Sequence, residues 1–182
     1  MTREEAKECA LRWMDEATAN GHPVSAEEIA DYRDRMDFLM DGIVTELGAV
    51  FPLYGTAEYE ISAEDRRMQP LPTDFRRFRR MTEADSGRDL TVSCDGRMVR
   101  FPPECAGSFL LHYERKPVSG NVLDCAPEAE PLVPLRLAAD LLIGTAERAQ
   151  SGRLLADRFY EAVQRMQTTD PELTGISTVY AM

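Results

Sequence analysis

An Asp-Gly pair between two alternating apolar runs is the feature that most constrains the fold of this chain. Asp95-Gly96 separates residues 90–94 from residues 97–101, and such a pair favours a two-residue type I′ turn between antiparallel strands. The cross-strand pairs that follow are Cys94 with Arg97, Val92 with Val99 and Leu90 with Phe101. We therefore expect a β-hairpin with one apolar face and one mostly polar face.

A third run with strand periodicity follows the hairpin, over residues 108–115. Phe109, Leu111 and Tyr113 alternate there with polar or smaller apolar positions, so we expect this strand to extend the hairpin into a small antiparallel sheet. Tyr59 and Ile61 also alternate with polar residues, which is compatible with a short edge strand.

Apolar residues at helical spacing predict four helices, over about 2–20, 25–48, 132–143 and 153–167. The first two begin at capping boxes, Thr2 with Glu5 and Ser25 with Glu28. Residues 144–152 are either a break or a weakened continuation of helix. The first two helices and the last two are each expected to form a helical hairpin.

The expected fold class is α+β: an N-terminal helical hairpin, a small antiparallel β-sheet with its hairpin, and a C-terminal helical hairpin. Residues 1–167 are expected to form a single domain, with a loop over 117–130 and an extended C-terminal tail over 168–182. Phe75 and Phe78 lie three residues apart in the sequence, which suggests a single helical turn anchored to the core.

Charge is unevenly distributed along the chain, whose formal net charge is −11. Residues 1–50 carry 5 basic and 12 acidic side chains, whereas residues 66–100 carry 9 basic and 5 acidic ones. An acidic chain is a poor general ligand for nucleic acid, because neutralising phosphates requires a basic surface. Segments of opposite sign instead favour contact with a second copy of the chain or with a charged partner protein.

Residue types that carry chemistry are present, but not in catalytic or metal-binding patterns. Cys94, Cys105, His112 and Cys125 are zinc-type ligands, yet they are spread about 7 to 13 residues apart and form no close pair. Neither histidine stands in the pattern of a catalytic nucleophile and its base. We therefore expect no catalytic residue, no metal site and no cofactor.

Several segments occur in a fixed order after the N-terminal helices. They are Leu71-Pro-Thr-Asp-Phe75, Arg100-Phe-Pro102, Gly107-Ser-Phe-Leu-Leu-His-Tyr113-Glu-Arg-Lys-Pro117, Pro131-Leu-Val-Pro-Leu135-Arg-Leu-Ala-Ala139 and Leu155-Ala-Asp-Arg-Phe-Tyr160. In this order the chain resembles, over about residues 2–167, the head–tail connector (adaptor) proteins of tailed bacteriophages, in the version typical of phages and prophages of gut Firmicutes.

The resemblance implies a ring of identical subunits, a dodecamer, that docks under the portal protein at the head vertex. Such a ring extends the DNA channel and receives the next neck protein, a head-completion (stopper) or tail protein. DNA would pass through it without specific binding. The protein would belong to the neck of the virion and, during assembly, to the host cytoplasm, with no membrane partner, since no run approaches the roughly 20 apolar residues of a membrane span.

Three groups of residues are the candidate contacts to other subunits or to the portal. The acidic group is Asp31, Asp34 and Asp41, and the basic group is Arg76, Arg77, Arg79 and Arg80. Because the resemblance implies anchoring to the portal through a terminal segment, the tail with Thr178 and Tyr180 is the third.

Two other interpretations stay open. Arginines interleaved with Phe75 and Phe78 also occur in proteins that bind single-stranded nucleic acid. A small acidic α+β protein can also be a monomeric inhibitor or an immunity-type binding module, including one that mimics DNA.

Overall fold

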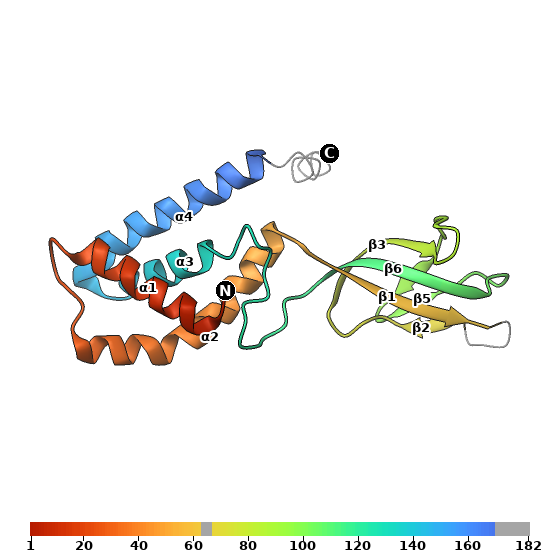
Figure 1. The fold of residues 1–182 in the computed structure, drawn as a ribbon, viewed down its shortest axis with the longest axis horizontal. Helices are drawn as coiled ribbons and strands as arrows, with labels where there is room; N and C mark the ends of the chain where they lie inside the picture. The colour runs from red at the N-terminus through yellow and green to blue at the C-terminus, as the bar shows by residue number, and fades with distance from the viewer. Residues whose placement is uncertain (63–66, 170–182) are drawn as a thin grey trace. The chain divides into compact units, whose positions relative to one another are not determined.

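The computed structural model describes residues 1–62 and 67–169, and its fold is α+β (Figure 1). Within these residues the elements are α1 (Arg3–Thr18), α2 (Ala26–Val50), β1 (Leu53–Ile61), β2 (Met68–Pro70), β3 (Phe75–Glu83), β4 (Ser93–Asp95), β5 (Met98–Arg100), β6 (Gly107–Arg115), α3 (Leu132–Ile143), a 3₁₀ helix (Ala146–Arg148) and α4 (Ala149–Thr169). Where the sequence predicts one domain over 1–167, the contacts group into two compact units. The helical unit is Met1–Glu46 with the described residues from Ser119 onward, and the β unit is Leu47–Val118.

Both capping boxes at the predicted helix starts are confirmed. The Glu5 backbone N–H donates to Thr2 Oγ1 at 3.2 Å, and the Thr2 N–H donates to Glu5 Oε2 at 2.7 Å. Ser25 and Glu28 make the same reciprocal pair at 3.3 and 2.8 Å. These bonds satisfy backbone donors that a helix start would leave without partners.

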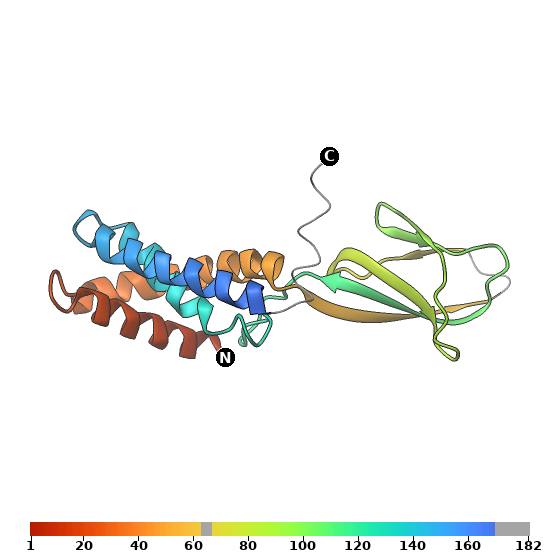
Figure 2. The same ribbon diagram turned by 90° about the horizontal axis from the view of Figure 1, so that it is seen from above.

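Helix α3 is the centre of the helical unit, where it packs against both α1 and α4 (Figures 1 and 2). Its buried residues are Leu132, Val133, Pro134, Leu135, Leu137, Ala138, Ala139, Leu141 and Leu142. The ambiguous stretch 144–152 is a break: a 3₁₀ turn, after which α4 begins at Ala149 instead of 153. Gly152 then lets α4 approach α3 closely, because a Cβ there would lie 2.7 Å from the Ile143 nitrogen.

The expected loop after β6 is held in place by the N-terminus. The Arg3 N–H donates to the Asn121 carbonyl, and the Leu123 N–H donates to the Met1 carbonyl, each at 3.0 Å. The N-terminal ammonium also pairs with Glu130 at 2.9 Å. Part of this loop therefore belongs to the helical unit.

Arg148, only 6% exposed, joins the start of α2 to the turn that follows α3. Its guanidinium donates to the carbonyls of His22 and Pro23 at 2.7 and 2.8 Å, and to both carboxylate oxygens of Glu28 at 2.7 and 2.9 Å. It also donates to the Tyr32 hydroxyl at 3.2 Å. The bonds that Glu28 accepts from Arg148 and from Ser25 lower the pKa of Glu28 to about 2.

The β unit contains two three-stranded antiparallel sheets, with strand orders β1-β6-β3 and β2-β5-β4. The prediction that the third strand extends the hairpin is therefore wrong. Strand β6 pairs with the nine-residue strands β1 and β3, while the short hairpin strands β4 and β5 pair with each other and with β2. Nine-residue neighbours give β6 a longer hydrogen-bonded ladder than a three-residue hairpin strand can. The expected edge strand is present as the longer β1.

The hairpin forms, but its predicted register is wrong by two residues. Cys94 pairs with Val99 and Asp95 with Met98, so Gly96-Arg97 is the turn. Gly96 takes a positive φ of 59° at the first turn position, which glycine adopts without steric cost. A shift of two residues keeps every side chain on its predicted face.

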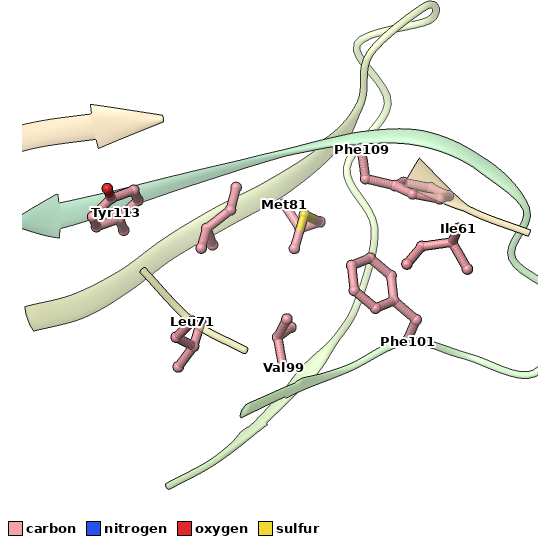
Figure 3. Packing of buried hydrophobic residues seen from close by; sticks show 8 residues of the cluster. Ile61, Leu71, Met81, Val99, Phe101, Phe109 and Tyr113 are labelled. Carbon is pink, nitrogen blue, oxygen red and sulfur yellow. The ribbon is translucent and has the colours of Figure 1, made fainter. Parts of the chain in front are cut away.

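The apolar faces of the two sheets meet in one core (Figure 3). Its buried members are Ile61, Leu71, Met81, Val99, Phe101, Phe109, Leu111 and Tyr113. The Phe101 ring lies 5.4 Å from that of Phe109 and 5.7 Å from that of Tyr59, centroid to centroid. The predicted alternation of Phe109, Leu111 and Tyr113 is confirmed as the inward face of β6.

Phe75 and Phe78 lie on a strand, so the predicted helical turn is wrong. The β3–β6 pairing shifts register between Phe75 and Arg77 and again between Phe78 and Arg80. Each shift is a bulge that adds one residue. One bulge lies between Phe75 and Phe78 and the other between Phe78 and Met81. These three residues therefore share the inward face at a spacing of three, which is also the spacing of a helix.

Replacing Arg148 with methionine should destabilise the protein by about 2–4 kcal/mol, because the Glu28 carboxylate and two carbonyls lose their donor. Urea denaturation measures this, with the exposed Arg153→Met as the control, expected within about 0.5 kcal/mol of wild type. Since the pKa of Glu28 is lowered on folding, its contribution should be present above about pH 4.5 and should fade as the pH falls toward 2. Equal loss in both variants would contradict the role assigned to Arg148.

Two glycines within helices should respond to alanine with opposite signs. Gly152→Ala should destabilise by about 1–3 kcal/mol, because the new Cβ meets the α3 backbone. Gly42→Ala in α2 meets nothing within 4 Å, so it should stabilise by about 0.5–1 kcal/mol through helix propensity. Thermal unfolding followed by circular dichroism distinguishes the signs, and a stabilised Gly152→Ala would refute the close approach.

Candidate protein–protein interface

The two bulges of β3 sort its four arginines into two classes. Arg77 lies opposite Glu114 and Arg80 opposite His112, so both belong to the outer face of the β1-β6-β3 sheet. Arg76 and Arg79 are the inserted residues of the bulges. All four side chains are exposed.

The bulge arginines are held by partners within the β unit. Arg76 donates to the Gly48 carbonyl. Arg79 donates to the Tyr54 hydroxyl at 3.1 Å, lies 5.3 Å from the centre of the Tyr54 ring, and pairs at 3.6 Å with the buried Glu114. These two arginines therefore stabilise the fold.

The outer-face arginines are available for contacts. Neither Arg77 nor Arg80 makes a hydrogen bond or ion pair with any residue that the structure describes. Arg80 borders a hollow of about 610 Å³, lined also by Tyr54, Thr56 and His112. The imidazole of His112 lies 3.2 Å from Thr82 Oγ1, a side-chain contact between the neighbouring strands β6 and β3.

The three predicted aspartates lie exposed on α2. Like the arginines, they differ in whether they have a partner within the chain. Asp41 pairs with Arg3 of α1 at 2.7 Å, and Asp31 pairs with Arg35 one turn along α2 at 3.6 Å. Asp34 has no such partner among residues 1–62 and 67–169. It is therefore the aspartate of the three most available to another molecule.

Phe38 is a candidate contact residue that the sequence analysis missed. Its side chain is 83% exposed, one helical turn beyond Asp34. Beside it lies a groove of about 630 Å³, with Asp41, Glu46 and Asp140 among its lining residues. The feature of the sequence that could have identified Phe38 is its position outside the apolar stripe of α2, which runs through Met36 and Met40.

Charge divides between the two units. Over the full sequence, residues 1–46 and 119–182 contain 10 basic and 21 acidic side chains, so they carry the whole net charge of −11. Residues 47–118 contain 11 of each sign. The arginines of β3 therefore lie in a neutral unit, and the aspartates of α2 in an acidic one.

Other predicted features fall elsewhere. Thr178 and Tyr180 lie outside the described residues. Within the described part of the chain, no group of three or more His, Cys, Asp or Glu side chains is placed to hold a metal ion, and no helix is long and apolar enough to cross a membrane.

No protein-family model and no curated protein matches the chain.

The two classes of arginine should separate in a stability measurement. Arg79→Ala should lower the free energy of unfolding by about 1–2 kcal/mol, because Glu114 stays buried without its cation and the contact with the Tyr54 ring is lost. Arg80→Ala should change it by less than about 0.5 kcal/mol, since the Arg80 side chain makes no hydrogen bond or ion pair with a described residue. Guanidinium denaturation monitors both variants, and equal effects would contradict the division.

Proposed function

We propose that this chain is a structural protein of a bacteriophage neck: a head–tail connector (adaptor) that forms a ring below the portal protein. The order of segments that resembles this family supports the proposal. So do the two surfaces of unlike charge. In this role the chain binds copies of itself, the portal on one side and a stopper or tail protein on the other, and it performs no catalysis.

The division of charge between the helical unit and the β unit is the observation that carries the proposal. A closed ring of identical subunits needs two different surfaces on each copy, because the first surface of one copy meets the second surface of the next. Exposed carboxylates on α2 and the exposed arginines Arg77 and Arg80 on β3 are such a pair. Opposite charges attract and orient the two surfaces during assembly.

A net acidic helical unit also suits a conduit for DNA. Carboxylates repel phosphates, so DNA can move past an acidic wall without the binding that a basic wall would cause. In this proposal the protein works at the head–tail interface of the virion, after assembly in the host cytoplasm.

A second candidate, a monomeric acidic inhibitor or immunity-type protein, is favoured by the same exposed carboxylates on α2. It would present them to a basic enzyme or mimic DNA. The two candidates differ in one measurable respect, because only the connector requires a second copy of the chain.

Co-expression with the products of the adjacent genes tests the proposal. We expect ring-shaped particles by negative-stain electron microscopy, with this chain as a repeated subunit, and a portal gene among the neighbours. Because such proteins can stay monomeric until the portal is present, the chain purified alone is the control and not the test. A chain that remains monomeric with every neighbouring product and captures a single basic enzyme instead would exclude the connector.

A further inference from the structure

Phe38 is the most exposed of the large apolar side chains that the structure describes. A phenylalanine that is 83% exposed keeps most of its apolar surface in water, and covering it would be favourable. Its neighbours one turn away on α2 are Asp34, Arg35, Asp41 and Gly42, and they leave the ring exposed. Large aromatic side chains that stand out among polar residues are typical anchors of protein interfaces.

The groove beside Phe38 is suited to a cationic side chain. Asp41, Glu46 and Asp140 contribute carboxylates to its lining, and Gly42 lines it without a side chain. Arg3 and Arg136 pair with Asp41 and Asp140 respectively, whereas Glu46 has no ion pair with a described residue. A guanidinium entering here would meet a free carboxylate and could stack on the ring of Phe38, as arginine does on aromatic faces.

We infer that this groove receives Arg77 and Arg80 of a second copy, so that Phe38 is the aromatic anchor of the subunit contact. The inference rests on the proposed ring and names its interface. Arg77 and Arg80 are suited to this role because they are exposed, lie on the outer face of an edge strand, and make no hydrogen bond or ion pair with the described residues of their own chain.

The second copy is the occupant that the charges favour. Every copy carries the acidic groove on its helical unit and the arginine strand on its neutral β unit. The two surfaces differ, so the contact is heterologous and repeats from copy to copy, which generates a ring when the rotation closes.

Variants in the co-expressed assembly test the contact. Phe38→Ala, and separately Arg77→Glu combined with Arg80→Glu, should reduce the yield of rings about tenfold or more, as loss of an interface anchor does. Gly42→Leu should do the same by filling the groove, without changing any charge. The matched controls are Leu154→Ala, a leucine 59% exposed on α4, and Arg97→Glu in the hairpin turn. Both controls should assemble as wild type does.

Photo-cross-linking identifies the two surfaces directly. A photoreactive phenylalanine analogue at position 38, in an equal mixture of unlabelled and heavy-nitrogen chains, should cross-link to peptides from residues 75–83, with both isotopes in one product. Cross-links within single chains only, or to other segments, would overturn the inference. If Phe38→Ala rings form at the wild-type yield, the interface is wrong and the connector stands. If the wild-type chain forms no ring, both the Phe38 interface and the connector function are excluded.

Discussion

The core of the β unit can be closed only if β3 departs from regular strand geometry twice. Phe75, Phe78 and Met81 must all face inward, and a spacing of three residues cannot do this on a regular strand of period two. Two bulges solve the problem by adding one residue in each step. The same bulges send Arg77 and Arg80 to the outer face, so the packing of the core creates the exposed arginines.

An equivalent sorting occurs on α2, where intrachain ion pairs use the carboxylates that face α1. Asp37 pairs with Lys7 at 2.8 Å and with Arg3 at 3.1 Å, and these cations lower the pKa of its carboxyl group. The side of α2 that carries Asp34 and Phe38 is left to solvent. Each unit therefore uses some of its charged side chains within its own fold and exposes others, among them Asp34 on α2 and Arg77 and Arg80 on β3.

Local signals predicted the helices well, because their determinants lie within a few residues. The capping boxes at Thr2 and Ser25 fix two starts, and the all-round apolar pattern of α3 fixes both its bounds and its burial. The face of the hairpin was also predictable, since alternation survives a shift of two residues. Its register was not, because Gly96 occupies the first turn position instead of the second.

The sequence could not predict contacts between residues that are far apart in the chain. The partner of β6 depends on strands far away in the chain, and the spacing of Phe75 and Phe78 is the same for a helix and for a doubly bulged strand. The candidate residues were predicted by type, but which of them are free depends on contacts such as Arg79 with Glu114. Phe38 was missed because a single aromatic residue off the apolar stripe gives no periodic signal.

We propose that copies of this chain meet through opposite charges on α2 and β3. The most direct measurement is the salt dependence of the assembly, followed by analytical ultracentrifugation between about 0.05 and 0.5 M NaCl, where the screening length shortens severalfold. Electrostatic contacts predict that copies dissociate as the salt concentration rises. An assembly that is unchanged or strengthened by salt would contradict the claim.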